Sequence, residues 1–487
     1  MTNNFQDPQV WLEQYEESAI KDRYQMLMEI LQEPLTKEWL KEIDWADILL
    51  QMSDEIQSCN LHQEMLAFVR LIREQQPKFY RQEFSFYDRF VVQYALHTKD
   101  NNLLETGLAH FAKYPGRDLD NFFAVIDLLI FYEQTDRAIE LAETTYPKIL
   151  SDRDLDNGLA EELAWLIITQ ELEQIYRQQQ QGDPPDWQEY QFQSGNYDFD
   201  VPPEWQKGAQ EAIKQGLDLD LDEFLSLFKR NKFQSQAFLA LSIAFYIYMS
   251  SNYQMSFCCA QRIWSNICSF WDTRELKAKQ QTNPNTFFGF TQPELEQHLT
   301  EKIFNPFSLK QAEGFATLWG LPYLYEFLLD AGIIREQIYK KAIAIIDSLK
   351  TELLAGYQNN YELWHYDFIN RWQPNRSTPE KTAQAIQEQF QANFAYSEPL
   401  TDVAGEGHLE QMFSNLAETL GIDPDAMKSG FRDIEDDSDD SKSETLEAAT
   451  IKEETTPPEP QPKTTNKKSR KKKKKSGFGL AAELYKK

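Results

Sequence analysis

Glycine is scarce in this chain of 487 residues, which contains only 18 of them. That share is about half of the ~7% found in an average protein, and a fold made of strands needs many tight turns that glycine serves best. Hydrophobic residues make up 41% of the chain and charged residues 26%, which is enough apolar surface for a large core. The composition therefore favours an all-α protein, and the length predicts two or three folding units.

The residue patterns that signal known chemistries are also missing. The four cysteines, at positions 59, 258, 259 and 268, form neither a disulfide framework nor the paired C-x-x-C spacing of a zinc site. No H-E-x-x-H, G-x-x-x-x-G-K-[ST] or G-x-G-x-x-G occurs. Glu294 and His298 are spaced to share a cation, but a surface hydrogen bond is the commoner role of such a pair. We therefore predict no catalytic residues, no metal and no cofactor, and we interpret the cysteines as reduced core residues.

No apolar run approaches the ~20 residues that a membrane-spanning helix requires. The most apolar stretch, from Ala237 to Met249, is too short, and the first residues, MTNNFQDPQVW, lack the basic region and apolar run of a secretion signal. We expect a cytoplasmic protein without a transmembrane segment, or a nuclear one if the cell is eukaryotic.

The charge is strongly unbalanced, with 49 Lys and Arg against 78 Asp and Glu, a formal net charge of -29. Near the C-terminus the sign reverses. An acidic block at 433–460 holds 11 acidic and 2 basic residues, whereas a basic block at 463–487 holds 11 basic and 1 acidic. A body this acidic repels phosphate backbones at long range, so any contact with a polyanion is expected through the basic block.

Four apolar, helix-periodic segments in the N-terminal part each run into a proline. The prolines are Pro34, Pro77, Pro115 and Pro147, separated by 43, 38 and 32 residues. Because proline cannot continue a helix, each one is predicted to end the second helix of a hairpin. Helix pairs that recur at this length predict a solenoid of helical hairpins.

The clearest hairpin lies within residues 121–147, where a first apolar helix is predicted to end near Gln134 and a second to begin near Asp136. The second segment, with the small Ala138 near its start, resembles the second helix of a tetratricopeptide repeat, whose alanine lets paired helices approach closely. The resemblance covers about residues 20–150 and implies a protein-binding scaffold. The alternative is a set of ordinary antiparallel hairpins with no family relationship.

We predict four parts for the whole chain: a helical-hairpin repeat domain at 1–180, a linker rich in proline and aromatic residues at 181–204, a second helical domain at 205–397, and a largely disordered tail at 398–487. In the second domain, the segment from Phe238 to Met249 has almost no polar face, which predicts a central helix buried nearly all round.

Two groups of apolar residues are candidate partner-binding sites. The linker contains Trp187, Tyr190 and Phe192, whose rings either pack on neighbouring helices or form a docking strip for a partner. A short amphipathic helix is predicted near 407–420 in the tail, with Leu420 and four candidate binding residues on one face: Leu409, Met412, Phe413 and Leu416.

The basic block is the strongest compositional signal. Its centre is predicted to bind polyanions without base specificity through Lys467, Lys468, Arg470, Lys471, Lys472, Lys473, Lys474 and Lys475. The alternatives are a nuclear import signal, attraction to anionic lipid, and pairing with the acidic block upstream.

The leading hypothesis is a non-catalytic helical-repeat adaptor or scaffold that binds a protein or peptide partner. A second hypothesis is a nucleic-acid- or ribosome-associated protein tethered by its lysine-rich tail. A third is an enzyme of unrecognised class with a pocket in the second helical domain.

Overall fold

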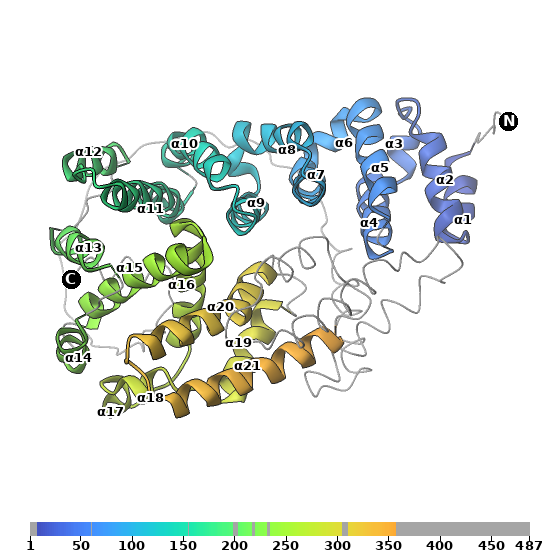
Figure 1. The fold of residues 1–487 in the computed structure, drawn as a ribbon. Coiled ribbons are helices and arrows are strands. Elements are labelled where there is room, and N and C mark those ends of the chain that lie inside the picture. The colour runs from blue at the N-terminus through green and yellow to red at the C-terminus, as the bar shows by residue number, and fades with distance from the viewer. Residues whose placement is uncertain are drawn as a thin grey trace, which may run out of the picture. The chain divides into compact units, whose positions relative to one another are not determined.

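The computed structural model describes residues 7–59, 61–153, 155–197, 203–216, 220–230, 234–303 and 310–356. Throughout these ranges the regular structure is helical, with 21 α-helices, one short 3-10 helix and no strand, which confirms the all-α prediction (Figure 1). The predicted tail at 398–487 lies outside the described residues, as does its amphipathic helix.

The helices follow one another along the chain with short connections. In order, they are α1 (Pro8–Glu16), α2 (Ile20–Ile30), α3 (Trp39–Glu42), α4 (Trp45–Ser58), α5 (His62–Gln75), α6 (Pro77–Gln82), α7 (Phe84–Thr98), α8 (Asn101–Lys113), η1 (Pro115–Arg117), α9 (Leu119–Phe131), α10 (Thr135–Ser151), α11 (Asn157–Gln181), α12 (Trp187–Asn196), α13 (Pro203–Gln215), α14 (Leu221–Lys229), α15 (Gln234–Tyr253), α16 (Phe257–Asp272), α17 (Ala278–Gln281), α18 (Pro284–Phe287), α19 (Gln292–Ile303), α20 (Gln311–Asp330) and α21 (Glu336–Gly356).

The chain divides into two compact units, and the described part of the first ends at Leu27. In this unit the side chain of Asp7 caps α1 by accepting a hydrogen bond from the amide of Gln9. The rings of Trp11 and Tyr15 stack with their centres 5.1 Å apart, and both side chains are buried. The described part of the second unit begins at Met28 and contains everything considered below.

Several helical hairpins of the second unit use the same kind of turn. The pairs α7–α8, α9–α10 and α15–α16 are joined by turns in which Lys99, Glu133 and Gln254 have φ angles of 59°, 55° and 56°. This left-handed conformation ends a helix by letting the next amide reach back to its last carbonyls. Glycine is the usual residue at such a position, so a glutamate or glutamine there needs a reason.

The prolines divide the chain differently from the prediction. Pro77 and Pro115 follow helices, as expected, but each also begins the next helical segment, α6 and η1. Pro147 lies inside α10, which continues to Ser151. The prediction that Pro147 ends a helix was therefore wrong, because helix packing on both sides of the proline outweighs the loss of one main-chain hydrogen bond. The small residue of this hairpin, Ala138, is fully buried.

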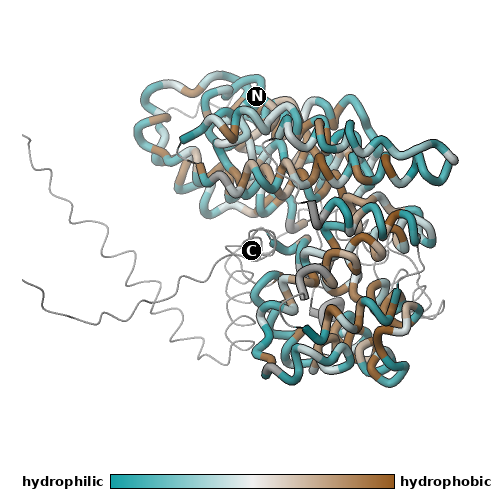
Figure 2. Tube along the Cα trace, turned by 90° about the vertical axis from the view of Figure 1, so that its left-hand side faces the viewer, coloured by the Kyte–Doolittle hydropathy of each residue, from teal (hydrophilic) through white to brown (hydrophobic). Residues whose placement is uncertain are grey.

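A central group of helices, α15, α16 and α20, packs together in the second unit (Figure 1). The predicted burial of α15 on nearly all sides is confirmed, since Leu239, Ile243 and Ile247 are as buried as Leu241 and Phe245. Helix α20 approaches α16 closely at Gly320, where an added Cβ would lie 2.5 Å from a methyl group of Ile263. Figure 2 shows the hydrophobic residues alternating with hydrophilic ones along the helical segments.

Helices from the two predicted domains meet in this unit. Helix α9 packs against α16 and α20, and α11 packs against α16. The segment predicted as a linker contains a helix, α12, that packs on α11. The junction brings turns that are far apart in the sequence next to one another, and a cleft lies there.

Candidate functional site

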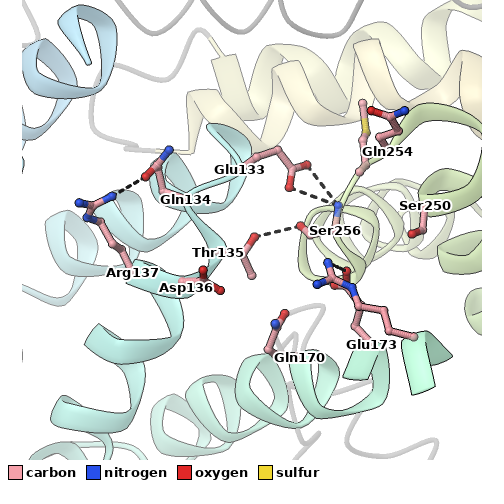
Figure 3. Close-up of a pocket in the computed structure, with 12 residues that line it drawn as sticks. Glu133, Gln134, Thr135, Asp136, Arg137, Gln170, Glu173, Ser250, Gln254 and Ser256 are labelled. Carbon is pink, nitrogen blue, oxygen red and sulfur yellow. Dashed lines mark hydrogen bonds and ion pairs between the residues drawn. The ribbon is translucent and has the colours of Figure 1, made fainter. Parts of the chain in front are cut away.

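The cleft at the junction has a volume of about 430 Å³. It is lined by the α9–α10 turn, by α11 and by the α15–α16 turn, and its walls are polar (Figure 3). Both left-handed residues of these two turns, Glu133 and Gln254, line it. Backbone conformations that are costly for residues other than glycine are often retained where the side chain has a role, and the side chain of Glu133 has one in this cleft.

Two glutamates of the cleft wall point at the N-terminus of α16. Glu133 accepts a hydrogen bond from the amide of Ser256 at 3.2 Å (Figure 3). Glu173 accepts one from the amide of Phe257 at 2.8 Å. The hydroxyl of Ser256 completes the cap by accepting from the amide of Cys259. A helix N-terminus leaves main-chain amides unpaired and carries partial positive charge, so these carboxylates stabilise α16 where an anionic ligand would otherwise bind.

The remaining contacts of the cleft mix both charges with amides and hydroxyls. Arg177 forms an ion pair with Glu173 at 2.5 Å, and 57% of its side chain is exposed. Arg137 pairs with Glu105 and donates to Gln134. The side-chain amides of Gln134, Gln170 and Gln254 also line the cleft. The cleft thus offers both charged and neutral hydrogen-bond donors and acceptors.

The thiol nearest the cleft is not activated. The sulfur of Cys258 lies 3.7 Å from the carbonyl oxygen of Leu166 and 3.8 Å from Oε1 of Gln170. Burial raises the pKa of this thiol well above its ordinary value, and the neighbouring Glu173 raises it further. Cys258 and Cys259 are both fully buried, which confirms their interpretation as core residues, whereas Cys59 and Cys268 are only half-buried.

A buried ion network lies further along α16. The guanidinium of Arg262 donates to Glu162 at 2.6 Å and lies 3.0 Å from a carboxylate oxygen of Asp127. Burial raises the pKa of Asp127 to about 7, and it outweighs the opposing attraction of Arg262. These charges join α9, α11 and α16, so they hold together the elements that form the cleft.

A second polar cluster lies in the α7–α8 hairpin and centres on Asp88, which is fully buried. Its carboxylate accepts from Arg73 at 2.6 Å, from the hydroxyl of Tyr80, and from Nδ1 of His110 at 3.0 Å. Histidine spacings typical of metal sites do not reveal this cluster, so it was not predicted from the sequence. The sequence does contain one indication of the pair: Asp88 and His110 are equally far along the chain from the turn residue Lys99, so the two helices of the hairpin bring them opposite each other.

The site residues predicted from the sequence differ in exposure where the structure describes them. Tyr190 is buried, Trp187 is half-buried with its ring 5.6 Å from that of Tyr190, and Phe192 is 64% exposed. Leu409, Met412, Phe413, Leu416 and the basic residues at 467–475 lie outside the described residues. The candidate pair Glu294 and His298 does not form, since Glu294 accepts from Thr291 and Arg274 while His298 is buried against Phe270.

Within the described ranges, no group of three or more His, Cys, Asp and Glu side chains is arranged to hold a metal ion. In the same residues no helix combines the length and hydrophobicity that crossing a bilayer demands. Comparisons with models of protein families, with curated proteins and with solved structures find no match to this chain.

Proposed function

We propose that this protein is a non-catalytic helical scaffold that binds a protein or peptide partner in the cleft between the α9–α10 and α15–α16 turns. The observation that carries the proposal is the composition of the cleft wall. Its amides, hydroxyls and charges of both signs match the donors and acceptors that a peptide main chain presents. The tetratricopeptide resemblance of the α9–α10 hairpin supports the same proposal as an analogy.

Three groups in or beside the cleft that could perform chemistry are already engaged in the fold. Glu133 and Glu173 each bind a main-chain amide of α16, and the thiol of Cys258 is buried with a raised pKa. A general base or nucleophile needs to be free to reach a substrate. Binding therefore requires less rearrangement of this wall than catalysis does.

The test uses two aspartates in matched positions. Asp136 and Asp120 are both exposed and both occupy the first turn of a helix, α10 and α9 respectively, but only Asp136 lines the cleft. Charge reversal at either position costs a similar helix-dipole energy, on the order of 0.5 kcal/mol. Partners of the intact protein are captured by chemical crosslinking and identified by mass spectrometry.

We expect a protein partner that is retained by the wild type and by Asp120→Arg and is lost from Asp136→Arg. A partner retained equally by both variants would place the binding site elsewhere. Turnover of a substrate that depends on Asp136 would replace the scaffold proposal with an enzymatic one.

A further inference from the structure

One region of this acidic protein carries excess positive charge. Between Arg73 and Arg117, seven Lys and Arg residues stand against five Asp and Glu, whereas the whole chain has a net charge of -29. This stretch runs from the end of α5 through α6, α7 and α8 to η1, and these elements pack on one another. None of its residues lines the cleft of the proposed function. Glu105 is linked to that cleft only through its ion pair with Arg137.

Cations in this region lie on aromatic rings. The guanidinium carbon of Arg73 is 4.8 Å from the ring centre of Tyr80, that of Arg117 is 5.9 Å from Phe84, and the amine of Lys113 is 5.0 Å from Tyr114. Such contacts hold long charged side chains against the surface while their charged ends stay in water.

The aromatic rings of this region also lie close to one another. The ring of Phe84 lies 5.6 Å from the imidazole of His110 and 6.2 Å from the ring of Tyr114, which is 44% exposed. The rings of Tyr80 and Phe84 are buried and lie beneath the others. We call the five residues that reach solvent above them the basic aromatic surface: Arg73, His110, Lys113, Tyr114 and Arg117.

The buried carboxylate of Asp88 fixes two members of this surface from below. It accepts from Arg73 and from Nδ1 of His110, whose side chains are 26% and 31% exposed. Side chains held in place before binding lose less conformational entropy when a ligand arrives. Lys113 and Arg117 are exposed, and no ion pair within the described part of the chain neutralises them.

We propose that the basic aromatic surface binds a short acidic segment of a partner protein. Carboxylates of such a segment match Lys113, Arg117 and the outer edge of Arg73, and the aliphatic parts of its side chains match the ring of Tyr114. A short peptide fits better than a nucleic acid, because a longer polyanion would extend beyond the basic aromatic surface onto the strongly acidic remainder of the chain, which repels it. The inference is independent of the cleft and goes beyond the proposed function.

The test measures binding of a fluorescent peptide of eight alternating Asp and Glu residues to the full chain by anisotropy. A peptide with Asn and Gln in the same places controls for charge. The surface variant is Lys113→Gln with Arg117→Gln. Its matched control is Lys341→Gln with Arg335→Gln, which also removes one exposed Lys and one exposed Arg. A third variant, with glutamine at Lys471, Lys472 and Lys473, removes charge from the basic block at 463–487.

We expect the surface variant to bind the acidic peptide about tenfold more weakly than the wild type, which corresponds to two charged contacts of modest strength. The control variant and the basic-block variant should bind as the wild type does, and binding should weaken with added salt. Four results would overturn the inference: no binding by the wild type, equal loss in the control variant, loss in the basic-block variant alone, or equal binding of the Asn and Gln peptide. Tighter binding of a single-stranded RNA that is also lost in the surface variant would assign this surface to nucleic acid instead.

Discussion

A carboxylate oxygen of Glu133 lies 3.2 Å from the main-chain nitrogen of Ser256, a residue 123 positions further along the chain. This contact explains why a glutamate occupies a left-handed turn position that favours glycine. The turn of one hairpin supplies a cap to the second helix of another. The turn residue Lys99 has the same backbone conformation but an exposed side chain, so the two positions can be compared directly.

Glycine should have opposite effects at these two turns. Lys99→Gly relieves an unfavourable backbone conformation and should raise the free energy of unfolding by about 0.5 to 1 kcal/mol. Glu133→Gly gains the same relief but removes a charged hydrogen bond at the N-terminus of α16, worth about 1.5 to 3 kcal/mol, so it should destabilise the protein. Denaturant unfolding measures both changes. If both variants shift stability in the same direction, the cap formed by Glu133 contributes little.

Arg262 should be much more sensitive to substitution than an exposed cation. Arg262→Met leaves the half-buried carboxylates of Asp127 and Glu162 without their cation, which should cost up to about 3 to 5 kcal/mol. Lys340→Met is the control, because Lys340 pairs with Glu336 on the surface and such an exposed pair contributes little to stability. Thermal unfolding of the two variants should differ accordingly, and similar melting temperatures would show that the network is not important for stability.

Burial of His298 should make stability depend on pH. Its side chain is buried, and burial together with the charge of Lys302 lowers the pKa of His298 from 6.5 to about 4. Between these values the unfolded chain binds more protons than the folded one, so stability is lost as the pH falls from 6.5 towards 4. His298→Leu should reduce that loss by up to about 3 kcal/mol. Urea titrations of both proteins at pH 7 and pH 4.5 measure the difference; parallel pH profiles would contradict the role of His298.

Ala138 tests the packing of the α9–α10 hairpin. Its side chain is fully buried, so the larger ring in Ala138→Trp forces neighbouring side chains apart and should cost about 1 to 3 kcal/mol. The exposed Glu140 on the same helix gives the control Glu140→Trp. An unchanged melting temperature for Ala138→Trp would mean that the hairpin tolerates an open contact at this point.

The basic block allows a test of the nucleic-acid hypothesis. If residues 467–475 neutralise about four to six phosphates, RNA binding should weaken by roughly two orders of magnitude between 50 and 200 mM salt. Deletion of residues 463–487 should then abolish the binding measured by filter retention. Absence of RNA binding by the full chain at 50 mM salt would eliminate this hypothesis.

The sequence was sufficient for the features that depend on local periodicity. The all-helical class and the nearly complete burial of α15 follow from apolar spacing, and the burial of Ala138 agrees with the predicted hairpin. The end of α10 did not follow, because tertiary packing carries that helix past Pro147. The linker residue Tyr190 is buried because α12 packs on α11, and that contact depends on the fold.

The cleft could not be predicted from the sequence, for a similar reason. Glu133 and Ser256 have no shared motif, and each looks like an ordinary residue of a helix end. Only the packing of α9 and α11 against α16 brings them together. Polar residues at sites made by distant segments carry no fixed spacing, so their chemistry becomes visible once the helices are in place.

The pairing of Asp88 with His110 across the turn at Lys99 also limits how this hairpin can change in length during evolution. Adding or removing one residue in either helix rotates everything beyond it by about 100° and shifts it by about 1.5 Å. A single-residue insertion in α7 between Asp88 and the turn would therefore aim His110 away from Asp88, whereas Tyr80 and Arg73 precede the insertion and keep their places relative to Asp88. We expect relatives of this protein to tolerate two kinds of length variant. One changes the lengths of both helices so that Asp88 and His110 still face each other. The other changes the turn and leaves the helices in register.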